Sequence, residues 1–182
     1  MKLDAAQILK LDEYDAQRDA IRAQVMEEKR RRRIHAGPLT FLFENVETVR
    51  YQVQEMLRAE RLYRPAEVQH EIDTYNELLG APGELGCTLL IEITDPVERD
   101  ERLRAWRDLP GHLYARLPDG RLSRPLFDAR QVGDDRLSSV QYLKFPTSGT
   151  APVAIGSDLP GLEIETALTP EQRSALRADL GG

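Results

Sequence analysis

Cysteine and histidine are scarce in this sequence, and their scarcity excludes several kinds of site. The 182 residues contain one cysteine, Cys87, and three histidines. A single cysteine excludes a disulfide bond within the chain and any zinc or iron–sulfur centre built from several cysteines. His35, His70 and His112 lie in three separate segments, so the paired-histidine helix of zinc proteases is absent. Because Cys87 lies within the apolar run CTLLIEI, we expect it to be buried and slow to react.

Familiar catalytic and membrane signatures are also missing. The sequence has no GxGxxG or Walker A loop for nucleotide phosphates and no GxSxG turn for a nucleophilic serine. No apolar run approaches the ~20 residues of a membrane-spanning helix. The first residues, MKLDAAQILKLDEY, carry acids where a signal peptide has an apolar core. We therefore expect a cytoplasmic protein with no cofactor and no membrane partner.

Acidic residues outnumber basic ones, and the excess is confined to the later part of the chain. The net charge is −6, of which residues 1–61 contribute +1 and residues 62–182 contribute −7. An acidic chain is poorly suited to nucleic acid phosphates, so a nucleic acid partner is unlikely on this count. The content of 41% hydrophobic and 31% charged residues is typical of a globular chain whose length suits one domain.

The spacing of apolar residues predicts a helix-rich first part and a strand-rich second part. The helices are expected over residues 12–32, 46–62, 65–79, 95–109 and 169–180. The strands are expected over 39–43, 87–93, 112–117, 121–127 and 138–145, with a hairpin that pairs 152–157 and 162–168. This order predicts a single α+β domain over residues 1–182, helix-rich over 1–80, strand-rich over 84–168 and ending in a C-terminal helix over 169–180. In this fold the N-terminal helices pack on a mixed β-sheet and the last helix caps it.

A run of basic residues, KRRRR, ends the first expected helix. It comprises Lys29, Arg30, Arg31, Arg32 and Arg33. Cations at a helix C-terminus are stabilised by the helix dipole, so one interpretation is a solvated helix end. The alternatives are a docking surface for an acidic partner and a contact with a phosphate or RNA backbone, which the acidic total disfavours.

Polar side chains follow one face of the expected helix over 46–62. Gln52 and Glu55 lie on one row, beside Tyr51 and Arg58 and close to Glu44. This row could face water, or it could form a hydrogen-bonded cluster that is either closed or lines a cleft. Because the next helix starts only a few residues later, the two helices should pack antiparallel. That packing brings the row close to Tyr75 and Asn76. Arg18 lies on the apolar stripe of the first helix, so we expect it to point inward and meet Glu44 or Glu55.

Glu67 and His70 form a separate candidate site on the expected helix over 65–79. They are three residues apart and therefore share a helical face. Di-iron bundles need two such pairs and further carboxylates, whereas this sequence has one pair. An exposed pair is the simpler interpretation, and we predict no metal site.

Several segments resemble an uncharacterised bacterial group, domain-of-unknown-function family 3501. The segments are RRRRIHAG, FEN, YQVQEMLRAER, EIDTYNELL, ELGCTLLIEI and SSVQYLKFP, and the resemblance covers about residues 10–180. It implies no known activity or catalytic residue. Members tend to be encoded near rubrerythrin-like and iron–sulfur proteins, which hints at redox physiology. If the family uses a site, the matching positions are Glu44, Asn45, Tyr51, Gln52, Glu55, Arg58, Glu60, Tyr75 and Asn76.

Two functions from different classes follow. The first is a non-catalytic accessory or interaction protein of a redox or oxidative-stress system, with a rubrerythrin-like or iron–sulfur protein as partner. The alternative is an enzyme or sensor with a carboxylate-containing ligand or metal site in residues 44–76. The sequence leaves open whether the protein is an enzyme.

Overall fold

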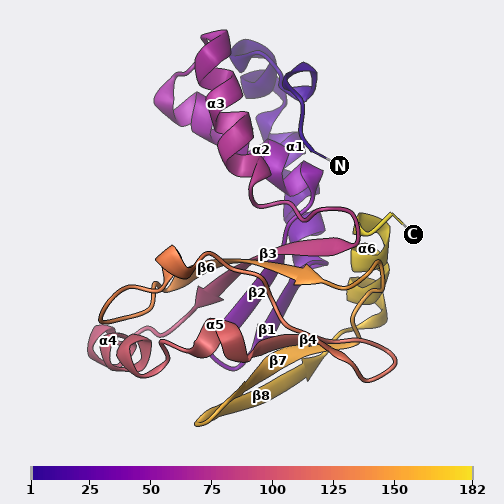
Figure 1. Ribbon diagram of the computed structural model, residues 1–182. Coiled ribbons are helices and arrows are strands. Elements are labelled where there is room, and N and C mark those ends of the chain that lie inside the picture. Colours follow the sequence, from indigo (N-terminus) through magenta and orange to yellow (C-terminus); the bar gives the residue numbers. More distant parts are fainter. Residues whose placement is uncertain (1, 182) are drawn as a thin grey trace.

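A computed structural model describes residues 2–181 and shows two sheets with a helical arm (Figure 1). The helices are α1 (Leu11–Arg30), α2 (Val46–Glu60), α3 (Pro65–Asn76), α4 (Pro96–Ala105), α5 (Leu109–His112) and α6 (Pro170–Asp179), with short 3-10 turns η1 (Ala5–Gln7) and η2 (Ala129–Gln131). The strands are β1 (Arg33–Ala36), β2 (Leu39–Phe43), β3 (Glu84–Ile91), β4 (Leu113–Arg116), β5 (Leu122–Ser123), β6 (Val140–Pro146), β7 (Ala154–Leu159) and β8 (Leu162–Ala167). The α+β class is therefore confirmed.

The strands form two four-stranded sheets rather than one mixed sheet. Their orders are β1-β2-β3-β6 and β5-β4-β7-β8, and every neighbouring pair is antiparallel. Apolar side chains from both sheets, such as Phe41, Leu89, Phe145 and Ile155, share one buried core. The expectation of a mixed sheet was wrong because apolar spacing shows where strands occur and carries no information about their direction.

Helix α6 packs against this shared core. Thr169 caps the helix: its hydroxyl accepts a hydrogen bond from the backbone N–H of Gln172 at 3.2 Å, and the Gln172 side chain binds back to the Thr169 N–H. Leu176 is fully buried in the core, and Leu180 packs beside it. The C-terminal helix predicted from the Thr169-Pro170-Glu171-Gln172 pattern is therefore confirmed.

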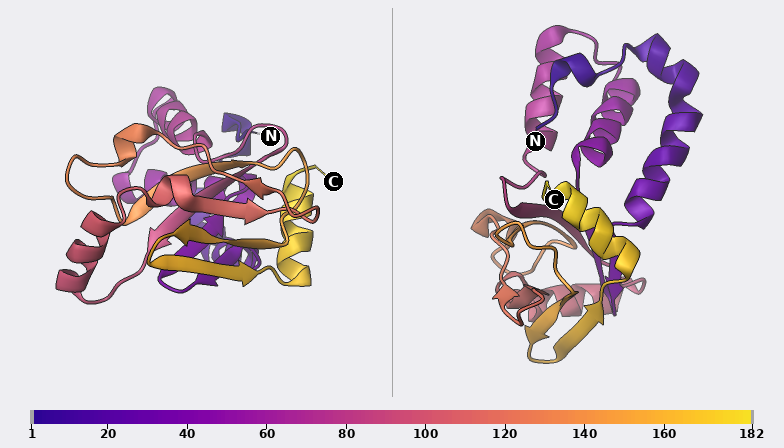
Figure 2. Two further views of the ribbon diagram at one scale, coloured as in Figure 1. Left: turned by 60° about the horizontal axis from the view of Figure 1, so that its bottom comes forward. Right: turned by 90° about the vertical axis from the view of Figure 1, so that its right-hand side faces the viewer.

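The helices α1, α2 and α3 form an arm with a hydrophobic core of its own. Val49, Val53 and Leu57 of α2 pack with Ile72 of α3, and the N-terminal residue Leu3 completes the cluster. Figures 1 and 2 show the arm projecting from one side of the first sheet. The helices were expected to lie on the sheet, but they bury their apolar stripes against one another instead.

Alternation along β3 divides its side chains between two surfaces. Cys87 and Leu89 face the core between the sheets, whereas Thr88 and Leu90 point to the opposite face, which the arm overhangs. This outer face of the first sheet forms one wall of the site described below. Within residues 2–181, no helix is both long enough and apolar enough to cross a membrane.

Candidate functional site

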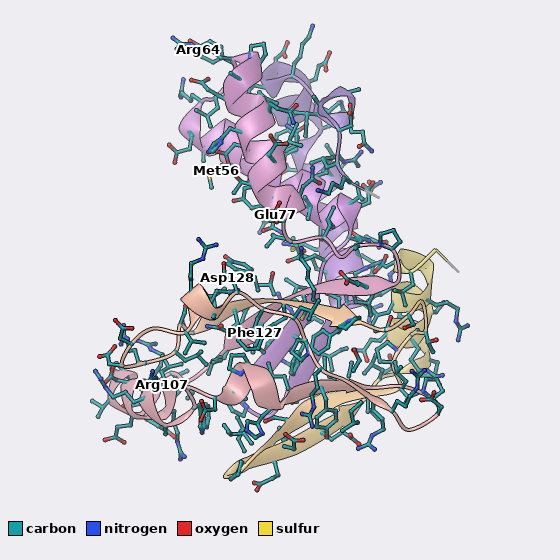
Figure 3. All side chains as sticks on the ribbon, viewed as in Figure 1. Met56, Arg64, Glu77, Arg107, Phe127 and Asp128 are labelled. Carbon is teal, nitrogen blue, oxygen red and sulfur yellow. The ribbon has the colours of Figure 1, made fainter. Side chains whose placement is uncertain are left out.

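A cleft of about 900 Å³ separates the helical arm from the outer face of the first sheet. The arm contributes Met56 and Tyr75, the sheet contributes Leu90 and Tyr142, and the segment around η2 contributes Phe127. Figure 3 shows Met56 on the arm and Phe127 on the opposite side. A mainly apolar cleft of this volume is typical of small-molecule sites.

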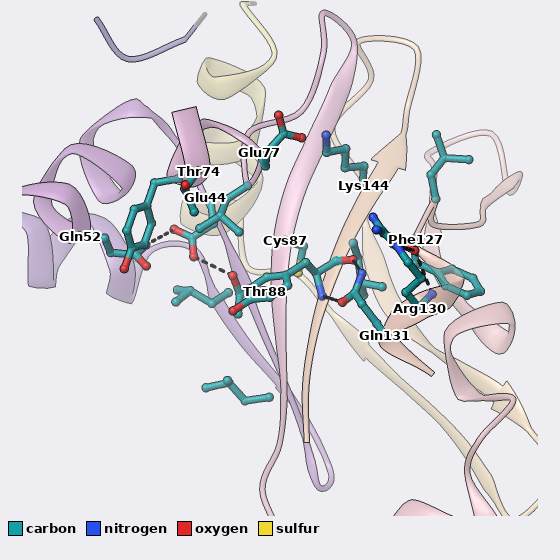
Figure 4. A pocket seen from close by; sticks show the side chains of 18 of the residues that line it. Glu44, Gln52, Thr74, Glu77, Cys87, Thr88, Phe127, Arg130, Gln131 and Lys144 are labelled. Atoms are coloured by element: carbon teal, nitrogen blue, oxygen red, sulfur yellow. Dashed lines mark hydrogen bonds and ion pairs between the residues drawn. The ribbon is translucent and has the colours of Figure 1, made fainter. Parts of the chain in front are cut away.

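Glu44 is the buried acid of this cleft. It lies between the end of β2 and the start of α2, and it is only 5% exposed. Its Oε2 accepts hydrogen bonds from the Thr48 hydroxyl at 2.6 Å and the Gln52 amide at 3.3 Å, and its Oε1 accepts from the Thr88 hydroxyl at 2.9 Å (Figure 4). Among residues 2–181, all its hydrogen-bonding partners are neutral. These partners therefore satisfy the side chain by hydrogen bonding and supply no direct countercharge.

Lys29 brings a positive charge to the same cleft from the last turn of α1. The side chain is half-buried, and its amine lies 5.5 Å from the centre of the Tyr51 ring. Burial lowers the pKa of Lys29, and the Glu44 carboxylate opposes this effect by favouring the charged amine. Within the described chain, the Lys29 amine has no hydrogen-bond acceptor, so a bound molecule can supply one.

A second group of polar residues joins α1 to α2 away from the cleft. The Arg18 guanidinium donates two hydrogen bonds to Glu55, at 2.8 and 2.7 Å, and the buried Tyr14 hydroxyl donates a third at 2.6 Å. The bond from Arg18 is the main cause that lowers the pKa of Glu55 to about 2. The expected bidentate pair is present, but Arg18 is 28% exposed rather than buried.

The other members of the expected cluster lie in separate places. Arg58 pairs with Asp15 at 2.6 Å, and the Tyr51 hydroxyl accepts from Arg22 at 3.0 Å. Asn76 exchanges two hydrogen bonds with the backbone of Leu3, at 2.8 and 3.0 Å. Asn45 caps α2, Glu60 is exposed at its end, and Tyr75 lines the cleft without joining the network. A single cluster was therefore the wrong prediction, because among residues 2–181 Gln52 is the one expected member that binds Glu44.

The comparison with protein families matches the model for "Protein of unknown function (DUF3501)" over residues 2–180. The chain belongs to this family. A crystal structure of a novel protein of unknown function from Burkholderia pseudomallei K96243 is similar, with a TM-score of 0.89 and 28% sequence identity. The match covers 99% of this chain and 100% of that chain. No curated protein matched the chain.

In this DUF3501 chain, three arginines of the basic run over residues 29–33 form ion pairs with acids of the same chain. Arg32 is 4% exposed and pairs through Nε and Nη2 with Asp179 at 2.7 and 2.8 Å, as well as with Glu28. Arg31 pairs with Glu28, and Arg30 pairs with Glu27 and Glu171. The pairs with Glu171 and Asp179 tie the end of α1 to α6, whereas those with Glu27 and Glu28 lie at the end of α1 itself. Arg32 therefore cannot serve as the exposed partner-binding residue that we expected, whereas Arg33 is exposed.

Sequence reasoning missed several residues of this site. Thr88 reaches Glu44 because Thr88 pairs with Leu42 in the sheet, and Glu44, two residues after Leu42, lies on the same face. Leu126 and Phe127 were expected at the end of a strand, but they lie between β5 and η2, where Leu126 pairs with Lys144 of β6 as an isolated bridge and both side chains are exposed at the cleft. The run CTLLIEI is largely apolar and hides this placement; the signal that could have found Thr88 is its position next to Cys87, because successive strand residues face opposite sides of a sheet.

The Glu67–His70 pair lies on α3 beside a shallow depression. Within residues 2–181, no three His, Cys, Asp or Glu side chains gather closely enough to hold a metal ion. A Glu-x-x-His step therefore occurs here without the additional ligands that a di-iron site requires.

Proposed function

We propose that this protein binds a small amphipathic molecule in the cleft and acts as a non-catalytic sensor or accessory protein. The observation that supports the proposal is the position of Glu44, a buried carboxylate in a cleft with apolar walls. Burying a charge is costly, and a chain that keeps one in a cleft can recover part of the cost from a ligand. Of the two functions considered from sequence, the geometry favours the ligand site in residues 44–76.

The walls and the polar groups have different roles in this proposal. Leu42, Leu90 and Met56 offer apolar surface that favours the body of a ligand. Glu44 and Lys29 supply one acceptor site and one donor site, which fix its orientation. Because the arm supplies one wall and the sheet supplies the other, a bound ligand would also hold the arm in place. A sensor requires that ligand binding changes the conformation of the protein, here the position of the arm relative to the sheet.

A fluorescence titration with anilinonaphthalenesulfonate tests the proposal, because this dye emits strongly in apolar sites. The Met56→Asp variant places a negative charge in the cleft, where it repels the anionic dye, and the matched Met26→Asp variant places it on α1 outside the cleft. We expect Met56→Asp to weaken dye binding at least about tenfold, equal to about 1.4 kcal/mol. Met26→Asp should bind the dye as the wild type does. Equal binding by both variants would refute a ligand site in this cleft.

Association with a redox or oxidative-stress system is a separate proposal. Leu126 and Tyr142 are 56% and 49% exposed at the cleft, and exposed apolar residues of this kind favour a protein partner. Co-purification from the native host with mass spectrometry tests it. A rubrerythrin-like or iron–sulfur protein recovered with the wild type and lost with Leu126→Asp would support the proposal, and recovery with both proteins would contradict it.

A further inference from the structure

The hydrogen bonds around Glu44 limit what its carboxylate can still accept. A carboxylate has about four acceptor positions, two on each oxygen. Thr48 and Gln52 occupy Oε2, and Thr88 occupies one position on Oε1. One position on Oε1 is left for a ligand. Glu44 can therefore take one further donor, such as a single hydroxyl group.

Lys29 presents the opposite chemistry. Its ammonium group has three N–H donors, and within residues 2–181 none of them meets an acceptor. Burial lowers the pKa of Lys29, which means that the protein does not fully replace the hydration that the amine loses. A carboxylate from a ligand would supply both a countercharge and acceptors. The open donors of Lys29 thus require an anionic, acceptor-rich group.

From these two requirements we infer that the ligand is a hydroxy acid with an apolar chain. Its carboxylate binds the Lys29 amine, its hydroxyl donates to Oε1 of Glu44, and its chain lies along Leu42, Leu90 and Met56. This inference rests on the proposed function, because it specifies the ligand of the same cleft. In this arrangement the Lys29 amine pairs with the ligand carboxylate, and the Glu44 carboxylate accepts the hydrogen bond from the ligand hydroxyl.

Two other head groups suit the cleft less well. A primary amine would meet Glu44 favourably, but it would place a second cation beside Lys29, where Arg22 and Arg33 already act against the charged amine. A phosphate dianion would suit Lys29, but it would bring two negative charges close to the buried Glu44 carboxylate. A hydroxy acid carries one negative charge and one neutral donor, so it adds no cation beside Lys29 and brings less negative charge to Glu44 than a phosphate dianion does.

Calorimetric titration with four probes of equal chain length tests this inference. The probes are octanol, octylamine, octanoate and β-hydroxyoctanoate. We expect β-hydroxyoctanoate to bind most tightly, octanoate next, and octylamine most weakly. The gain from octanoate to β-hydroxyoctanoate should be about tenfold, which is typical of one hydrogen bond to a charged group.

Two variants test which residue binds the carboxylate of the ligand and which binds its hydroxyl group. Lys29→Met should weaken octanoate at least about tenfold and leave octanol unchanged, because only the charge is removed. Glu44→Gln should reduce the gain from the hydroxyl group and strengthen octanoate, because a repulsive charge is lost. Lys144→Met is the matched control, since this second cleft lysine lies on β6, away from Lys29, and we expect an effect below about twofold.

The outcomes separate this inference from the proposed function. Binding of octanol or octylamine in preference to both acids would overturn the hydroxy acid and leave the cleft as a ligand site. Equal loss of octanoate binding in Lys29→Met and Lys144→Met would overturn the role of Lys29. If none of the four probes binds and the dye does, the inference fails alone. If the dye fails as well, both fail. A circular dichroism melt of each variant confirms that it is folded.

Discussion

Glu55 provides the sharpest test of how the arm is held together. Replacing it by glutamine keeps the size of the side chain and removes the negative charge to which Arg18 and Tyr14 donate hydrogen bonds. Arg18 lowers the pKa of Glu55 from 4.5 to about 2. At one pKa unit per ~1.4 kcal/mol this shift sets an upper limit of about 3 kcal/mol. The Glu55 side chain is 26% exposed, so water and salt screen part of its attraction to Arg18 and the contribution to stability is smaller than this limit. We expect Glu55→Gln to lower the free energy of unfolding by about 1–2 kcal/mol at neutral pH.

The pH dependence follows from the sign of this shift. The pKa of Glu55 is lower in the folded state than in the unfolded chain, so the folded state holds the ionised form more strongly. The stabilisation is therefore complete above the unfolded value of 4.5 and is lost as the pH falls towards about 2. Urea unfolding followed by circular dichroism should show the two proteins converging over this range.

A control and a refuting result complete this test. Glu47 on the same helix forms a more exposed pair with Arg50, so Glu47→Gln should change the free energy of unfolding by less than about 0.5 kcal/mol. Glu55 does not line the cleft, so Glu55→Gln should bind the dye and the octyl probes as the wild type does. A stability difference that stays constant down to the acid limit would refute the assignment to the Glu55 charge. Altered probe binding would show that the arm and the cleft are coupled.

Three further predictions concern the rest of the fold. Arg32→Met should destabilise the protein by about 3–5 kcal/mol in urea unfolding, because it leaves Asp179 partly buried without its partner; a loss below about 1 kcal/mol would contradict this. Asn76→Ala should release the backbone of Leu3, and faster hydrogen exchange confined to the first ten or so residues would confirm it. Cys87 should react slowly with a thiol reagent until urea unfolds the protein, because burial raises the pKa of its thiol; rapid labelling of the native protein would contradict this.

Local signals in the sequence predicted the local parts of the structure. Asn45 and Thr169 stand at the start of two predicted helices and cap them in the structure, because a cap depends on residues three positions away. The hairpin between β7 and β8 followed from Leu159-Pro160-Gly161, where Gly161 adopts a positive φ of 83°. Arg18 meets Glu55, one of the two carboxylates expected for it, because the stripe of α1 that carries Arg18 packs against α2.

Contacts between distant segments could not be predicted in the same way. Asn76 binds Leu3, which is 73 residues away, and nothing in its local pattern marks an N-terminal residue as its partner. Strand β1 begins at the last of four consecutive arginines, a run that was interpreted as a helix end, so no strand was predicted here. The cleft has three walls from separate parts of the chain, and its third wall, residues 126–131, carries no recognisable motif.

The two ends of α2 explain why the cleft and the arm should respond differently to substitution. At the start of the helix, Glu44 binds Thr48 and Thr88, so its carboxylate connects the arm to the first sheet. Further along, the Glu55 carboxylate accepts hydrogen bonds from Tyr14 and Arg18 of α1, and within residues 2–181 it accepts none from the sheet, so it stabilises the arm alone. A ligand that engages Glu44 therefore acts at the junction between the two parts. If binding alters how the arm is held, Glu44→Gln should remove that effect while Glu55→Gln preserves it.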